Sequence, residues 1–121
     1  MKTPKSILER RRSIRIDEAL PFKIGHAEFE IAAQTVNISL HGALCVVEKS
    51  LPLMTQLAVG LTLPTVGSKR GKTLHIKGVV VRRDKEAQSE RYVTAIFFSD
   101  IKKEDQETLS RFITDRLASQ G

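Results

Sequence analysis

Short stretches in which apolar and polar residues alternate cover most of the chain between residues 20 and 98. In the clearest of them, at residues 56–63, every second residue from Leu57 to Leu63 is apolar and Pro64 ends the run. A period of two predicts a strand with one buried face. Weaker runs predict five further strands, at residues 20–24, 28–36, 43–47, 74–83 and 91–98. We expect a tight turn at Gly25-His26, a hairpin loop at residues 65–71 and a charged loop at residues 84–90.

The period changes to that of a helix after residue 100. Residues 102–117 contain neither glycine nor proline, and their apolar side chains form one stripe at helical spacing: Leu109, Phe112, Ile113 and Leu117. Asp100 stands where an N-cap is expected, and we expect the chain to fray from Ser119. Six strands followed by one helix predict a mainly β fold, an antiparallel barrel or sandwich over residues 20–99 with a C-terminal helix at residues 101–117.

The length and composition fit one soluble domain. The chain has 121 residues, of which 40% are hydrophobic and 28% are charged, as is ordinary for a globular protein. Its apolar stretches fall far short of the roughly 20 residues that span a bilayer, and no apolar segment follows the basic N-terminus as a secretion signal requires. The single cysteine excludes an internal disulfide. We therefore expect a cytoplasmic protein without membrane insertion.

The net charge of +6 is concentrated near the N-terminus. Residues 1–15 hold six basic side chains against Glu9, a balance of +5, whereas the rest of the chain holds 14 basic and 13 acidic side chains, a balance of +1. Residues 1–9 show no hydrophobic period and contain Pro4, which predicts a flexible tail. We expect a single domain over residues 10–121, in which residues 10–16 form a basic arm on a nearly neutral barrel.

Residues that could carry catalysis or bind a metal are scattered. His26, His41 and His75 lack the spacing of metal ligands, and structural imidazoles are the simpler interpretation. Cys45 lies within an apolar run, where it is most simply a small core residue. The sequence contains no glycine-rich phosphate loop of the known types. We therefore expect neither an enzyme nor a bound metal or cofactor.

Two other segments combine residue types that bind nucleotides. In the first, Arg11 and Arg15 lie four residues apart, which separates them by up to about 14 Å in an extended chain. A guanidinium is a planar cation that matches phosphate oxygens and the O6/N7 edge of guanine. In the second, residues 35–43, a strand gives way to small polar residues and Gly42. Each segment alone has a plainer interpretation, as a solvated basic tail or as an ordinary strand connection.

Together, Arg11-x-x-x-Arg15 and the later Asn37-x-Ser39-x-x-Gly42 resemble the PilZ domain, a bacterial receptor for cyclic di-GMP. Residues 76–82 look like the Gly-x-Val strand of that family, and residues 92–98 look like its last strand. The resemblance implies a six-stranded antiparallel β-barrel with a C-terminal helix, in agreement with the alternation pattern.

The resemblance implies cyclic di-GMP-binding residues at five positions: Arg11, Arg15, Asn37, Ser39 and Gly42. The arginines would bind phosphate and guanine, Asn37 and Ser39 would hydrogen-bond guanine and backbone oxygens, and Gly42 would keep the turn open. Many members carry Asp where this chain has Asn37, and an amide accepts fewer of the N–H groups of guanine than a carboxylate does. We expect binding to persist, weakened by about 1 kcal/mol.

Arg10, Arg12 and His41 are further candidates for the same site. In this family the residue before the first motif arginine influences whether one ligand or a stacked pair is held, and Arg10 favours the pair because it adds a guanidinium for a second nucleotide. Arg10 and Arg12 are equally compatible with a position in solvent. His41 is a candidate for stacking on a base.

The resemblance also implies a mode of action. Repulsion among basic residues predicts that residues 1–12 are disordered without ligand and fold against the barrel when its phosphates bind. The changed surface would signal to a protein effector that the sequence does not identify. Motility, biofilm formation, pilus assembly, polysaccharide export and virulence are all compatible processes.

Two alternatives stay open. One is a PilZ-type adaptor that binds no nucleotide, and the other is a small nucleic-acid-binding barrel with a basic arm. Such barrels usually present stacking aromatics, but this chain has five Phe, one Tyr and no Trp. Most of these rings, notably Phe97, Phe98 and Phe112, are expected in the core. We therefore expect no DNA or RNA partner.

Overall fold

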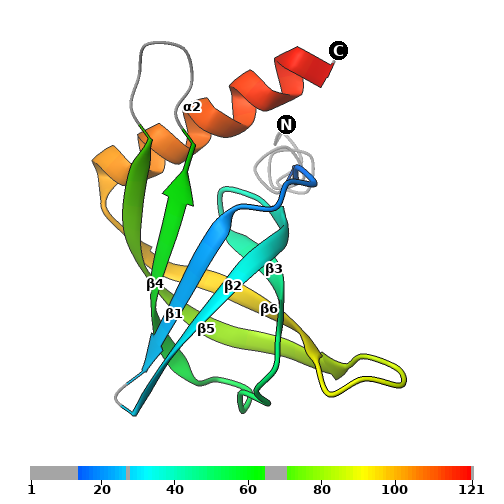
Figure 1. Ribbon diagram of the computed structural model, residues 1–121. Coiled ribbons are helices and arrows are strands. Elements are labelled where there is room, and N and C mark those ends of the chain that lie inside the picture. Colours follow the sequence, from blue (N-terminus) through cyan, green and yellow to red (C-terminus); the bar gives the residue numbers. More distant parts are fainter. Residues whose placement is uncertain (1–13, 27, 65–70, 121) are drawn as a thin grey trace, which may run out of the picture.

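In the part of the chain that the structure describes, six strands close into one antiparallel β-barrel and one helix follows them (Figure 1). The computed structural model describes residues 14–26, 28–64 and 71–120. The strands are β1 (Pro21–His26), β2 (Phe29–Ile38), β3 (Gly42–Val47), β4 (Gln56–Leu63), β5 (Lys72–Lys85) and β6 (Tyr92–Ile101), and the helix α2 spans Lys103–Gln120. Around the barrel the order is β1-β2-β3-β6-β5-β4. The fold class expected from the sequence is confirmed.

Alternate residues of the strands fill the barrel interior, as the period of two predicts. In β4 the inward residues from Leu57 to Leu63 are at most 5% exposed. Helix α2 lies across one end of the barrel (Figure 1), and Leu109, Phe112 and Ile113 belong to the same buried cluster as the strand residues. Because burying a large apolar side chain contributes about 1.5–3 kcal/mol, this contact stabilises the barrel as well as covering its end.

The first hairpin differs from its prediction. Gly25 and His26 were expected to turn the chain, but both lie in β1, opposite Glu30 and Phe29 of β2. The rings of His26 and Phe29 stack with their centroids 5.1 Å apart. Pairing between β1 and β2 therefore extends to His26, the last residue of β1, and the turn comes after it.

The boundaries of the helix also differ. Asp100 is not an N-cap, because it belongs to β6 and pairs with Lys77. Strand pairing therefore continues to Ile101, and α2 begins later than residue 101. The expected fraying at Ser119 is wrong as well, since α2 runs to Gln120 and the Ser119 hydroxyl donates to the Asp115 carbonyl at 3.0 Å. No helix in the described residues is long and apolar enough to cross a membrane.

One aromatic residue expected in the core lies at the surface. Phe98 and Phe112 are 5% and 7% exposed, but Phe97 is 47% exposed. Neighbouring residues of a strand point to opposite faces, so only one of the two adjacent phenylalanines of β6 can enter the barrel. Phe97 therefore lies on the outer face.

Cys45 lies in the barrel core, and its burial changes the pKa of the thiol. It is 0% exposed in the core, as expected, and its Sγ donates to the Thr94 carbonyl at 3.6 Å. Burial disfavours the thiolate and raises the pKa of the thiol from 9.0 to about 12. Since the unfolded chain loses this proton near pH 9 and the folded one retains it until about pH 12, stability should fall as the pH rises between these values.

The reactivity of Cys45 provides a prediction. Because the thiolate is the nucleophile and the folded chain suppresses it, we expect a thiol reagent such as Ellman's reagent to leave the native protein unmodified at pH 8. After unfolding in guanidinium chloride it should modify one thiol per chain, matching the single cysteine. Rapid stoichiometric modification under native conditions would contradict the placement of Cys45.

Candidate functional site

Residues 14–20, which precede β1, are hydrogen-bonded to β2. Ile16 and Ile38 form an antiparallel bridge, with N–O distances of 2.9 and 3.0 Å in the two directions. Both side chains are at most 1% exposed and belong to the core. Farther along, the Leu20 carbonyl accepts from Thr35 N–H at 3.0 Å. These contacts fix the direction of the segment and place Arg15, which precedes Ile16, beside the end of β2.

Arg15 and Asn37 meet at this point, although 22 residues separate them in the sequence. The Arg15 Nη1 donates to Asn37 Oδ1 at 2.9 Å. Arg15 is exposed and Asn37 is half-buried. The two sequence motifs, predicted from separate segments, are therefore joined by a direct hydrogen bond between one residue of each.

A bulge in β2 aims Asn37 outward. The pairing of β2 with β3 shifts between Thr35 and Asn37, so Val36 is an extra residue in the strand. Thr35 and Ile38 both face the interior, at 2% and 0% exposed. Without the extra residue the alternation would send Asn37 into the core and Ile38 to the surface. The bulge therefore presents the amide at the outer face.

The turn after β2 is closed by Ser39. Its backbone N–H donates to the Gly42 carbonyl at 2.9 Å. Its hydroxyl accepts from His41 N–H at 3.2 Å and donates to the Gly42 carbonyl at 3.3 Å. Ser39 is 1% exposed, so in this conformation its hydroxyl serves the turn. Half-buried His41 is held at the same place, because its carbonyl accepts from Phe98 N–H at 2.8 Å.

Gly42 lets β3 approach β6 closely. It pairs directly with Phe97, and a Cβ built on Gly42 would lie 2.5 Å from the Ile96 carbonyl oxygen. That oxygen is backbone and cannot move aside without disturbing the strand. The glycine is therefore required by packing between two strands of the barrel.

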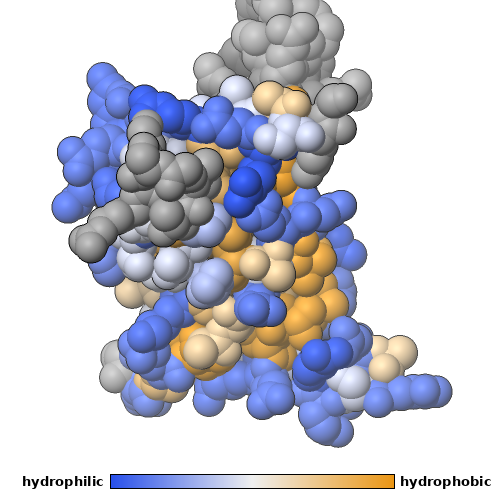
Figure 2. Space-filling model, turned by 45° about the horizontal axis from the view of Figure 1, so that its top comes forward, coloured by the Kyte–Doolittle hydropathy of each residue, from blue (hydrophilic) through white to orange (hydrophobic). Residues whose placement is uncertain are grey.

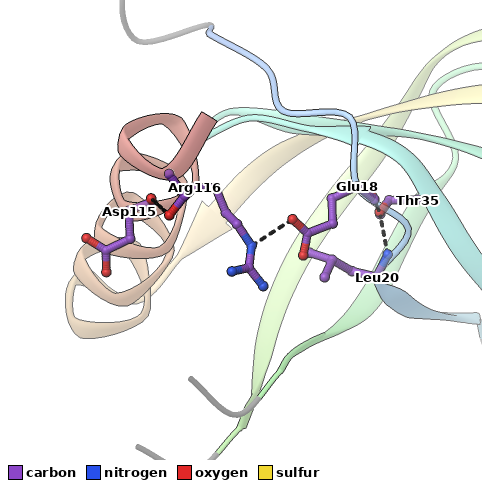
Figure 3. A network of polar contacts seen from close by, with 6 residues as sticks. Glu18, Leu20, Thr35, Asp115 and Arg116 are labelled. Carbon is purple, nitrogen blue, oxygen red and sulfur yellow. Dashed lines mark hydrogen bonds and ion pairs between the residues drawn. The ribbon is translucent and has the colours of Figure 1, made fainter. Parts of the chain in front are cut away.

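A polar network connects the same segment to α2. In Figure 3, Arg116 reaches from the helix toward Glu18, and its Nε lies 2.7 Å from Glu18 Oε1. The Glu18 carbonyl accepts from the Thr35 hydroxyl at 2.6 Å, and that hydroxyl accepts from Leu20 N–H at 2.9 Å. The segment that carries Arg15 is thus tied both to β2 and to the helix. No local sequence pattern marks Glu18, Thr35 and Arg116 as partners, because they meet only after folding.

The guanidinium of Arg15 has a different kind of partner from the guanidinium groups of three other arginines. Arg82, Arg91 and Arg116 each form an ion pair with a carboxylate. Within the described residues, Arg15 has no carboxylate oxygen within 4.0 Å, and its partner is the neutral amide of Asn37. Its positive charge is therefore available to an anion. Such an arrangement suits a phosphate or the polar edge of a guanine.

The structure places five of the predicted site residues: Arg15, Asn37, Ser39, His41 and Gly42. They lie together around the end of β2, the turn and the start of β3. Arg10, Arg11 and Arg12, the predicted tail and most of the hairpin loop at residues 65–71 lie outside the described residues. Within those residues no cluster of three or more metal-ligating side chains occurs.

The chain matches one known protein family. The family model described as PilZ domain matches residues 9–115, which is most of the chain. Among curated proteins, none matches the sequence significantly.

Two solved structures have a similar fold. The Bacillus subtilis inhibitor of motility (MotI/DgrA) is 25% identical, with a TM-score of 0.79 over 93% of this chain. The match covers 53% of that protein, so this chain spans about half its length. The PilZ domain of YcgR from Escherichia coli, solved with c-di-GMP, is 17% identical, with a TM-score of 0.60 over 92% of this chain and 95% of that one. This second likeness supports the fold.

Proposed function

The chain belongs to the PilZ domain family, and from this premise we propose that it is a receptor for cyclic di-GMP that signals to a protein partner. The observation that carries the proposal is the hydrogen bond between Arg15 and Asn37, at 2.9 Å. This hydrogen bond joins the two motifs at an exposed position. Among the described residues, the positive charge of Arg15 has no carboxylate partner. Cyclic di-GMP offers phosphates and guanine edges, and both are groups that a guanidinium binds.

Each residue of the pair has a distinct role in this proposal. Arg15 donates to a phosphate oxygen or to the O6/N7 edge of a guanine. The Oδ1 of Asn37 already accepts from Arg15, and its NH₂ group supplies donors for the acceptors of guanine. The second lone pair of Oδ1 accepts from a guanine N–H. One amide thus orients both the arginine and the base.

The other motif residues complete the proposed site. Ser39 holds the turn and Gly42 allows the close contact of β3 with β6, so both residues help to position Asn37. Arg11 supplies a second guanidinium, and Arg10, Arg12 and His41 are the remaining candidates for ligand contact. No bound cofactor is part of the proposal.

Signalling would pass through the segment that carries Arg15. Arg15 lies three residues before Glu18, which is ion-paired to Arg116 of α2. Ordering of the basic arm by a ligand would therefore change the surface beside the helix, where a protein partner could bind. The Bacillus subtilis neighbour is an inhibitor of motility, which supports motility as one process to examine first.

Competition for a fluorescent cyclic di-GMP analogue tests the proposal against its alternatives. Unlabelled cyclic di-GMP should displace the analogue, while single-stranded DNA of unrelated sequence should not. Binding of DNA that weakens steeply with salt and ignores cyclic di-GMP would favour the nucleic-acid-binding barrel. Binding of neither would favour the nucleotide-free adaptor.

The proposed switch makes a prediction for limited proteolysis. Saturating cyclic di-GMP should slow trypsin cleavage after Arg10, Arg11 and Arg12, because a bound segment is a poor protease substrate. Cleavage after Arg91, in the hairpin between β5 and β6, should keep its rate. Equal cleavage of the arm with and without ligand would contradict the switch.

A further inference from the structure

Apolar side chains cover the outside of the barrel where β3, β6 and β5 lie side by side. In β3 and β6 the inward residues alternate with outward apolar ones. In Figure 2 apolar surface (orange) extends along the right of the molecule, the side on which β3 lies in Figure 1. We call the outward set the outer apolar face: Leu44, Val46, Val79, Val81, Val93, Ala95 and Phe97. Phe97 and Val81 are its most exposed members, at 47% and 50%.

The strand register joins this face to the Arg15–Asn37 pair. Directly opposed residues of antiparallel strands share a face. Asn37 pairs with Leu44, and Leu44 pairs with Ala95. Two strand spacings therefore separate Asn37 from β6, which is about 10 Å. A ligand anchored at Asn37 needs only to cross Leu44 to reach β6.

Phe97 lies opposite a residue that has no side chain. It pairs with Gly42 in β3 and with Val79 in β5. Because Gly42 has no side chain, nothing on β3 stands beside the ring at that register position. The contact of Gly42 with the Ile96 carbonyl excludes a larger residue there. The aromatic surface thus remains available next to the polar pair.

We propose that Phe97 is a stacking platform for a purine base, and that it forms with Gly42 and Leu44 a base-binding surface adjoining Arg15 and Asn37. This inference rests on the proposed function, since the same ligand is held at the polar pair. A purine has an apolar π-face and a polar edge, and the two parts of this surface match them. A cyclic dinucleotide holds two bases and two phosphates on one ring. One molecule can therefore contact the Arg15–Asn37 pair and the surface of Phe97 at the same time.

Three substitutions of Phe97 test the platform in the full chain by titration with cyclic di-GMP. Phe97→Ala should weaken binding about tenfold, since stacking on an aromatic contributes substantially for each base. Phe97→Leu should also weaken binding, because it keeps apolar area but removes the aromatic plane. The chain has no Trp, so Phe97→Trp adds a single tryptophan whose emission a stacked guanine should quench. Leu53→Ala, which removes a 55% exposed apolar side chain outside the face, should bind like the wild type.

The outcomes separate this inference from the proposed function. Wild-type binding together with a loss in Phe97→Ala and Phe97→Leu and quenching in Phe97→Trp supports the platform. Wild-type binding with unchanged affinity in those two variants and no quenching overturns the platform and leaves the receptor function standing. Absence of binding by the wild type overturns the receptor function, and the platform with it. Since Phe97 is a surface residue, unchanged unfolding temperatures should show that the variants are folded.

Discussion

Replacing Arg15 with alanine is expected to weaken cyclic di-GMP binding about a hundredfold. The side chain supplies a guanidinium that donates to the neutral side-chain amide of Asn37 and has no carboxylate partner among the described residues. Hydrogen bonds to charged groups contribute about 1.5–3 kcal/mol each, and a guanidinium that binds a phosphate or a guanine edge can form two. The fold should not change, because Arg15 is exposed and the bridge between Ile16 and Ile38 remains. Calorimetric titration measures the loss.

Two further variants control this experiment. Arg111→Ala removes the same charge from an exposed position of α2, and its affinity should stay within about twofold of the wild type, since exposed charges in salt contribute little. Arg15→Lys keeps the charge and loses the planar fork, so it should bind with intermediate affinity. If Arg15→Ala bound as tightly as Arg111→Ala, the arginine would have no role in the site.

Replacing Gly42 with alanine is expected to destabilise the fold by about 3 kcal/mol, at the upper end of the usual cost of overpacking. The new Cβ would lie 2.5 Å from the Ile96 carbonyl oxygen, a distance that real Cβ contacts do not reach. Relief requires β3 to move away from β6, which weakens the backbone pairing and displaces the turn that positions Asn37. Denaturant unfolding should show a lower midpoint.

Gly60→Ala provides the matched control. The nearest atom to its Cβ would be the Cβ of Lys23 at 3.7 Å, which is ordinary van der Waals contact. Since glycine in a strand costs about 0.5–1 kcal/mol relative to alanine, this substitution should be neutral or slightly stabilising. Equal unfolding midpoints for the Gly42 and Gly60 variants would contradict the close approach of β3 to β6.

The sequence predicts the fold well where the alternation is uninterrupted. β4 was expected at residues 56–63 and spans Gln56–Leu63, because its regular pattern and Pro64 define both the strand and its end. Strand ends elsewhere depend on partners distant in the sequence. Asp100, for instance, stays in β6 because Lys77 lies opposite it, which no local capping rule reveals.

The candidate site was predictable in its residues and less so in its geometry. The spacing of the motifs pointed to Arg15 and Asn37, and the structure brings both together. The outward direction of Asn37 depends on the bulge at Val36, which simple alternation through residues 35–38 cannot show. The internal hydrogen bonds of Ser39 and the exposure of Phe97 likewise follow from tertiary packing.

The central claim is that the surface around Arg15 and Asn37 binds cyclic di-GMP. Its most direct test is an isothermal titration of the full chain with cyclic di-GMP at physiological salt. The account predicts saturable binding that reaches a molar ratio of one or two ligands per chain and is largely lost in Arg15→Ala. The absence of saturable heat at a large molar excess of ligand, or unchanged binding by Arg15→Ala, would contradict it.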